Sequence, residues 1–237
     1  MAFLQSGPAR EPMFKAPASV LALIGVLAAA HVARMLVPAA TSEHILIDYA
    51  FIPLRYAANV LDPGSILDRA IPFVSYIFLH ADATHLVINC LWLLAFGSVV
   101  ARRFRFGLFF LFFVVCGLAA AMTHLLFNWG SPEPVIGASG AIAGLMAAGV
   151  RMLSVQTLRG VEPLNGLLPL LSPQVLMFSA LWVVMNLVFG LAGVGFAGES
   201  NAIAWQAHLG GYFAGLFLAG AFDHWARKTD PNPALLA

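Results

Sequence analysis

Apolar residues gather along this chain in six stretches, which polar, Gly-rich and Pro-rich segments separate. An α-helix rises about 1.5 Å per residue, so about 20 apolar residues cross the hydrocarbon core of a bilayer. The pattern therefore predicts an all-α membrane protein built as a bundle of six transmembrane helices. Their expected ranges are about 19–37, 84–100, 106–127, 139–152, 174–192 and 202–222.

The remaining segments are expected to be tails and loops. Residues 1–17 and 226–237 are polar enough to be solvent-facing tails, and residues 18–225 form the single expected core. The segment 38–83 mixes charged residues with apolar clusters, which predicts a long loop partly dipped into the membrane interface. Pro and Gly in the segment 128–136 predict a turn before the fourth helix. The sequence shows no repeat and no separate soluble domain.

The composition agrees with a membrane location. Hydrophobic residues make up 61% of the chain and charged residues 10%, whereas soluble domains carry about 25% charged residues. The sequence therefore indicates an integral membrane protein, and it holds no basic patch that would bind nucleic acid. Cys90 and Cys116 lie inside apolar stretches and are expected to pack as small apolar side chains.

The distribution of basic residues predicts an orientation. Lys and Arg concentrate in the two tails and in the loops that follow the second and fourth stretches. Because cytoplasmic loops carry the excess of Lys and Arg, this distribution places both termini in the cytoplasm. The loops 38–83, 128–138 and 193–201 then face outward. A bacterial inner membrane is the simplest location for such a compact chain.

Four polar side chains fall at similar depths in the predicted helices. Counted from the charged cytoplasmic end of each helix, Ser139 lies at about 18 Å, Asn89 at about 20 Å, His208 at about 22 Å and His85 at about 25 Å. These residues share one layer, between the midplane and the outer surface of a core about 30 Å thick. The fourth helix is too short to cross that core, so Ser139 begins it within the membrane. Irregular backbone at that depth is tolerated only where it is buried or lines a water-filled cavity.

Two pairs of glycines predict that the fourth and sixth helices touch. Gly140 and Gly144 are four residues apart on one helix, and Gly211 and Gly215 are four apart on the other. Paired small faces let two backbones approach closely in a membrane. His208 lies one turn before Gly211, so the same contact would bring it towards Ser139.

These residue types suit acyl transfer. A serine hydroxyl becomes a nucleophile when a base takes its proton, and neutral histidine suits that role near pH 7. Ser139 and His208 are therefore expected to form a dyad, since no Asp or Glu lies at their depth to complete a triad. The Ser139 backbone amide and the side chains of His85 and Asn89 are candidate oxyanion donors. Each residue also has a structural interpretation, because serine, histidine and asparagine join membrane helices through hydrogen bonds.

Three motifs resemble those of the rhomboid family of intramembrane serine proteases, over about residues 19–223. In chain order they are His80-x-x-x-x-His85-x-x-x-Asn89, Gly137-x-Ser139-Gly140 and Ala207-His208-x-x-Gly211-x-x-x-Gly215. The resemblance implies a six-helix core with Ser139 as nucleophile and His208 as general base. It implies that His85 and Asn89 stabilise the oxyanion and that neither a metal nor another cofactor takes part.

The resemblance also implies a substrate class, namely membrane-spanning segments of other proteins that enter sideways past the fifth helix and the connector 193–201. Two features depart from the family. Ala143 stands where some members carry an aromatic residue beneath the histidine ring, which leaves Tyr212 or Trp205 as candidates for that support. Ile71-Pro72-Phe73 stands in the neighbourhood where many members carry a Trp-Arg pair.

Two other functions remain open. The main alternative is a non-catalytic relative that binds or chaperones transmembrane helices on the same scaffold. The joint presence of Ser139, His208, His85 and Asn89 favours the enzyme, because binding alone requires none of them. A proton-coupled transporter is a further alternative, since histidines within the membrane act as proton relays. The absence of interrupted, paired spans in the two halves disfavours it.

Overall fold

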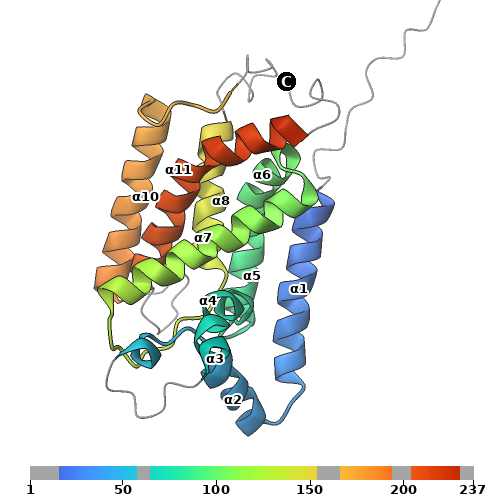
Figure 1. Ribbon diagram of the computed structural model, residues 1–237, viewed down its shortest axis with the longest axis vertical. Coiled ribbons are helices and arrows are strands. Elements are labelled where there is room, and N and C mark those ends of the chain that lie inside the picture. The colour runs from blue at the N-terminus through green and yellow to red at the C-terminus, as the bar shows by residue number, and fades with distance from the viewer. Residues whose placement is uncertain (1–15, 58–64, 154–165, 194–203, 230–237) are drawn as a thin grey trace, which may run out of the picture.

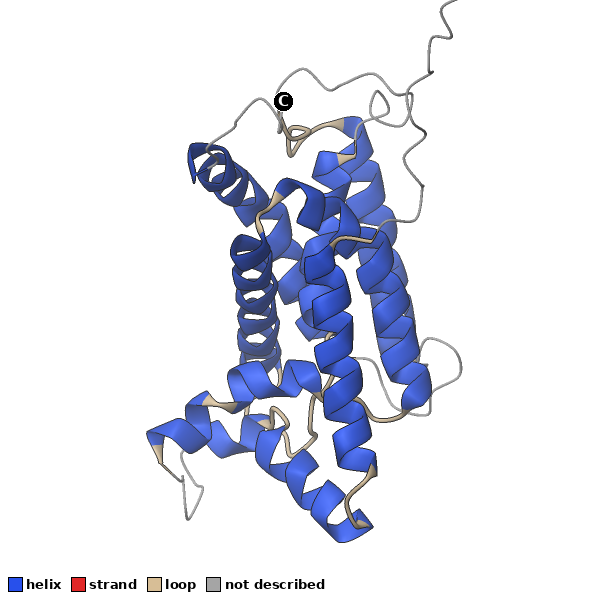
Figure 2. Ribbon diagram, turned by 90° about the vertical axis from the view of Figure 1, so that its right-hand side faces the viewer, coloured by secondary structure: helices blue, strands red, loops and turns tan. Residues whose placement is uncertain are grey.

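The described part of the chain is helical. The computed structural model describes residues 16–57, 65–153, 166–193 and 204–229. In these ranges Figure 2 shows helices and loops without strands, and the only β-type pairing is an isolated bridge between Phe51 and Val135. The expectation of an all-α protein is therefore confirmed for the described residues.

Four of the described helices are long and apolar enough to cross a membrane. They are Ala18–Met35 (α1), Ala83–Arg103, Phe106–Phe127 (α7) and Pro173–Ala192 (α10). A fifth helix, Ser139–Met152 (α8), is apolar but has only 14 residues, and Trp205–Thr229 (α11) is longer but less apolar. The bounds of α7 and α8 coincide with the predicted ranges. The count of six spans and the orientation of the termini stay predictions.

The helix Ala83–Arg103 has three parts. Ala83–Trp92 (α5) passes into a π-helical turn, Leu93–Gly97 (η3), and then into Ser98–Arg103 (α6). The helix begins after Asp82, whose carboxylate accepts a hydrogen bond from the backbone amide of His85 at 2.9 Å. An aspartate in this position satisfies an amide that the first turn leaves unpaired. The cap therefore fixes the backbone that carries His85.

The segment 38–83, expected to be a long loop, contains a series of short helices at one end of the bundle (Figure 1). Proline at the first helical position starts two of them, and a Ser65–Asp68 capping box starts a third. Each of these helices depends on only one or two residues at its start. The sequence pattern therefore did not predict them among the apolar clusters of a segment that was interpreted as a loop. The helices are Ala39–Tyr49 (α2), Pro53–Tyr56 (η1), Ile66–Ala70 (α3), Pro72–Ser75 (α4) and Tyr76–Phe78 (η2).

The centre of the bundle is formed by α7, α8 and α11. α8 is buried along its length, and Figure 1 shows it with α7 and α11 between α1 on one side and α10 on the other. A Cβ atom on Gly211 would come closer than 3.0 Å to the carbonyl oxygen of Gly140. One on Gly215 would come as close to the carbonyl oxygen of Gly144. The backbones of α8 and α11 therefore touch along a seam that has no side chains.

α10 lies at the edge of the bundle and packs through one narrow face. Val175 and Asn186 are its only buried residues, while Met177, Leu181 and Leu191 are more than 60% exposed. The packed face repeats at helical spacing, and its members are Val175, Ser179, Trp182, Asn186 and Gly190. Of the connector 193–201, all residues but Gly193 lie outside the described part of the chain.

Candidate active site

Ser139 is placed by a backbone turn at Gly137. Gly137 has a φ of 115°, which L-residues rarely adopt, and its amide donates to the carbonyl oxygen of Tyr76 at 2.9 Å. A Cβ atom on Gly137 would lie 2.8 Å from the imidazole of His85. The turn therefore needs glycine both for its φ and for its contact with His85, and it delivers the chain to Ser139 as the first residue of α8.

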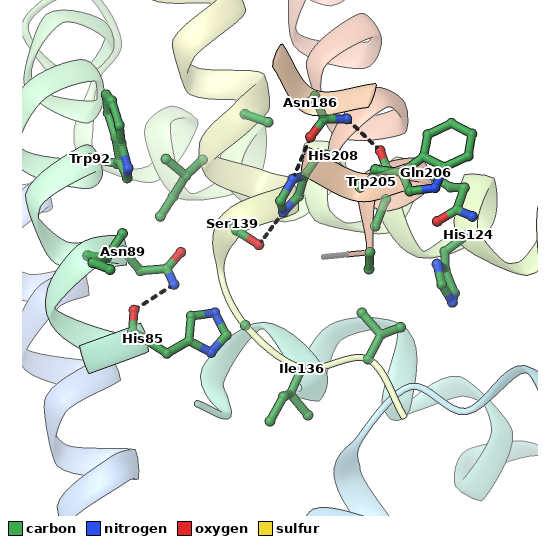
Figure 3. Close-up of a pocket in the computed structure, with 18 of the residues that line it drawn as sticks. His85, Asn89, Trp92, His124, Ile136, Ser139, Asn186, Trp205, Gln206 and His208 are labelled. Carbon is green, nitrogen blue, oxygen red and sulfur yellow. Dashed lines mark hydrogen bonds between the residues drawn. The ribbon is translucent and has the colours of Figure 1, made fainter. Parts of the chain in front are cut away.

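The hydroxyl of Ser139 meets the imidazole of His208. Ser139 Oγ and His208 Nε2 share a hydrogen bond of 2.8 Å, although the two residues are 69 positions apart. Ser139 comes from α8 and His208 from the first turn of α11 (Figure 3). The distance lies within the reach that a nucleophile and its general base require.

A third polar residue, which the sequence did not predict, contacts the other ring nitrogen of His208. His208 Nδ1 is 2.9 Å from Asn186 Oδ1, and Asn186 Nδ2 donates to the carbonyl oxygen of Trp205 at 3.0 Å. Asn186 is 4% exposed and comes from α10. The signal was present, because counting from Pro173 places Asn186 about 20 Å along its helix, the depth of the other four residues. The expectation of a dyad rested on the absence of Asp and Glu at this depth, and an amide can fill the same place.

The two aromatic residues proposed to support the histidine ring have other contacts. Tyr212 stacks on Trp182 with ring centroids 4.2 Å apart, and its hydroxyl shares a hydrogen bond of 2.8 Å with Ser179. Trp205 contributes its backbone carbonyl to Asn186. The contact that supports the His208 ring in the structure is its hydrogen bond with Asn186 of α10. No aromatic side chain is needed at Ala143 for this contact.

His85 and Asn89 lie across the site from His208, on α5 (Figure 3). Asn89 is 3% exposed, and its Nδ2 donates to the backbone carbonyl of His85 at 2.9 Å. A primary amide has two N–H donors, so one remains for another acceptor. The role of His85 and Asn89 as oxyanion donors stays a prediction.

These residues line a cavity of about 850 Å³. Ser139, His208, His85 and Asn89 line it, and Phe178 and Trp182 of α10 add apolar side chains to the lining. Such a combination of apolar lining and a few convergent polar groups is typical of ligand sites. Within the described ranges, no three His, Cys, Asp or Glu side chains lie close enough to hold a metal ion.

We expect Gly137→Ala to destabilise the protein more than Gly130→Ala does. Both glycines have positive φ, 115° and 76°, so each substitution costs about 1–3 kcal/mol of backbone strain. Only at Gly137 does the added methyl group also meet a side chain, that of His85, whereas Gly130 faces open space. Overpacking of this kind adds about 1–3 kcal/mol. Thermal unfolding in detergent measures the difference, and equal losses would contradict the contact with His85.

Comparison with known proteins finds matches to rhomboid proteins. A family model for the Rhomboid domain matches residues 68–224. A protein named Rhomboid protease GluP, from Bacillus subtilis (strain 168), is 31% identical over 145 residues, 61% of this chain and 24% of the relative. RHOMBOID-like protein 5 from Arabidopsis thaliana is 28% identical over 145 residues, 61% of this chain and 41% of the relative.

The aligned segment thus covers less than half of either relative, whereas the family match covers well over half of this chain. The matched residues 68–224 include Ser139, His208, His85 and Asn89. The chain therefore belongs to the rhomboid family.

Proposed function

We propose that the protein is an intramembrane serine endopeptidase that cuts transmembrane segments of other membrane proteins. The observation that carries the proposal is the 2.8 Å hydrogen bond between Ser139 Oγ and His208 Nε2 at the wall of a cavity. Family membership and the relative named as a protease support it. Neither a metal nor a cofactor is needed for this chemistry.

The reaction begins when Ser139 attacks the carbonyl carbon of the scissile peptide bond. His208 Nε2 takes the hydroxyl proton as the Oγ–carbon bond forms, and the imidazolium then gives that proton to the leaving amine. The acyl-enzyme is hydrolysed when a water molecule loses a proton to His208 and attacks the same carbonyl. The proton returns to Ser139 Oγ as the acid product leaves.

The oxyanion that forms at each attack needs hydrogen-bond donors. We assign this role to the backbone amide of Ser139, to His85 and to the second N–H of the Asn89 amide. Ser139 is the first residue of α8, so its amide belongs to the unpaired group at a helix N-terminus, which favours negative charge. Donors fixed before the reaction stabilise the transition state without a reorganisation cost.

The proposal includes an arrangement in the membrane. Six spans with both termini in the cytoplasm would open the cavity to the outer side, most simply in a bacterial inner membrane. The four long apolar helices support insertion into a bilayer. The loop segment 131–136, which lines the cavity together with Ser139, gives irregular backbone the protein-lined setting that a membrane requires.

The first test is covalent labelling of purified protein with a fluorophosphonate, followed by intact-mass and peptide analysis. We expect a single adduct on Ser139 and none in His208→Ala, because the hydroxyl reacts only when a base removes its proton. Ser98→Ala is the matched control, since Ser98 is a buried serine outside the cavity, and it should label as wild type does.

An unlabelled wild-type protein that remains folded would overturn the enzymatic proposal. The scaffold would then favour the alternative, a binder or chaperone of transmembrane helices, which needs the cavity and not the activated serine.

A further inference from the structure

We infer that Asn186 is a positioning residue that holds His208 in the tautomer and orientation a general base needs. The inference rests on the proposed function, because it assigns a task within the same site. It adds an α10 residue to the Ser139–His208 pair and makes the site a row of three: serine, histidine and asparagine.

The direction of each hydrogen bond in this row follows from its last member. The carbonyl oxygen of Trp205 can only accept, so the group that faces it at 3.0 Å is the NH₂ of Asn186. The amide oxygen of Asn186 therefore faces His208 Nδ1 at 2.9 Å and, being an acceptor, requires a proton there. A neutral imidazole carries only one such proton.

His208 Nε2 is consequently left with a free lone pair, 2.8 Å from Ser139 Oγ. The serine hydroxyl must then donate to it, which is the starting arrangement for proton transfer. The opposite tautomer would place a proton on Nε2 and leave no base beside the serine. One backbone carbonyl thus determines, through Asn186, which nitrogen of His208 accepts the proton.

An amide suits this place better than a carboxylate does. Asn186 is 4% exposed, and an ionised side chain at this depth would require a large desolvation free energy. The amide orients the ring and remains neutral, and both of its polar atoms have partners. Cysteine proteases of the papain type use an asparagine to orient histidine in a comparable row.

The packing of α10 indicates that Asn186 has a task beyond joining two helices. Other contacts already attach α10 to α11: the hydrogen bond between Ser179 and Tyr212 and the stacking of Trp182 on Tyr212. Gly190 adds a close approach, because a Cβ there would meet the side chain of Trp205. Asn186 is the one member of this face whose partner is the imidazole.

The test compares Asn186→Leu with Ser179→Ala in a cleavage assay on a reconstituted transmembrane reporter. Leucine has a similar volume but cannot accept from Nδ1, so we expect kcat to fall about 10- to 100-fold with KM within about twofold. Ser179→Ala removes a hydrogen bond from the same face of α10 without touching His208, and kcat should stay within about twofold of wild type. Asn186→Asp can accept from Nδ1 again and should recover part of the lost kcat.

A second measurement works even on a protein that shows no cleavage. In ¹⁵N-histidine-labelled protein, with His208 assigned by comparison with His208→Gln, NMR reports which ring nitrogen carries the proton. We expect protonated Nδ1 in wild type and in Ser179→Ala, and a mixture of tautomers in Asn186→Leu.

An unchanged tautomer in Asn186→Leu, or an equal loss of kcat in Ser179→Ala, would overturn the inference. The second result would mean that docking of α10 alone is what matters. If wild type fails to label at Ser139 yet the tautomer still depends on Asn186, the proposed function fails while the positioning role stands.

Discussion

Ser139→Ala is expected to lower the kcat for cleavage of a transmembrane reporter by at least about 10³-fold, and His208→Ala by a similar factor. Removing the serine leaves no atom to form the acyl-enzyme, and removing the histidine leaves the hydroxyl without a base, so the two effects do not add. Ser139→Ala, His208→Ala and the double variant should therefore be almost equally inactive. The measurement is initial rate in proteoliposomes, with thermal unfolding as the check on folding.

The controls for this prediction are Ser98→Ala and His44→Ala. Ser98 is buried on α6 and His44 lies on α2, and neither lines the cavity, so both variants should keep activity within about twofold. Residual cleavage by a well-folded Ser139→Ala above about one thousandth of the wild-type rate would show that another residue is the nucleophile.

Gly215→Ala is expected to prevent normal folding. The added Cβ would fall closer than 3.0 Å to three backbone atoms of Gly144, and a backbone in the middle of a buried helix cannot move aside as a side chain can. Overpacking of cores costs about 1–3 kcal/mol where side chains adjust, and we expect more than about 3 kcal/mol here. Thermal unfolding and the yield of monodisperse protein in detergent measure the loss.

Gly107→Ala is the matched control for Gly215→Ala. It also replaces a helical glycine, on α7, but nothing lies within 4 Å of the added atom. Alanine favours a helix interior over glycine by about 0.8–1.0 kcal/mol. Gly107 lies in the first turn of α7, where the gain is smaller, so this variant should be about as stable as wild type. Equal stability of the two variants would mean that α8 and α11 do not touch at Gly144 and Gly215.

The sequence predicted the long helices well because a bilayer imposes one dominant requirement on them. Each spanning segment must be apolar and must satisfy its own backbone hydrogen bonds, so hydrophobic length alone gave the bounds of Phe106–Phe127. The segment 38–83 lacks that requirement. Its short helices begin at Pro53, at Pro72 and after Ser65. Proline and serine are also common in loops, so these residues alone did not distinguish a short helix from a loop.

The sequence predicted those residues of the candidate site whose polar side chains are unusual within an apolar helix. Ser139 and His208 have similar predicted depths in the membrane, and each lies near a pair of glycines. In the structure, Ser139 Oγ and His208 Nε2 are 2.8 Å apart. Asn186 was not predicted because only an Asp or Glu was considered as the third residue, and an amide can orient histidine as well. The direction of the Asn89 amide was beyond sequence reasoning, since it depends on which of several carbonyls lies nearest.

The narrow attachment of α10 would have a consequence for the order of events in the proposed catalytic cycle. The same helix provides Phe178 and Trp182 to the cavity wall and Asn186 to His208. A guest segment that pushed α10 outward on entry would also remove the partner of His208 Nδ1, so attack could begin only after the helix had returned. A poorly fitting transmembrane segment would then have time to dissociate before it is cut. Selectivity would depend on how long a segment stays bound as well as on its affinity.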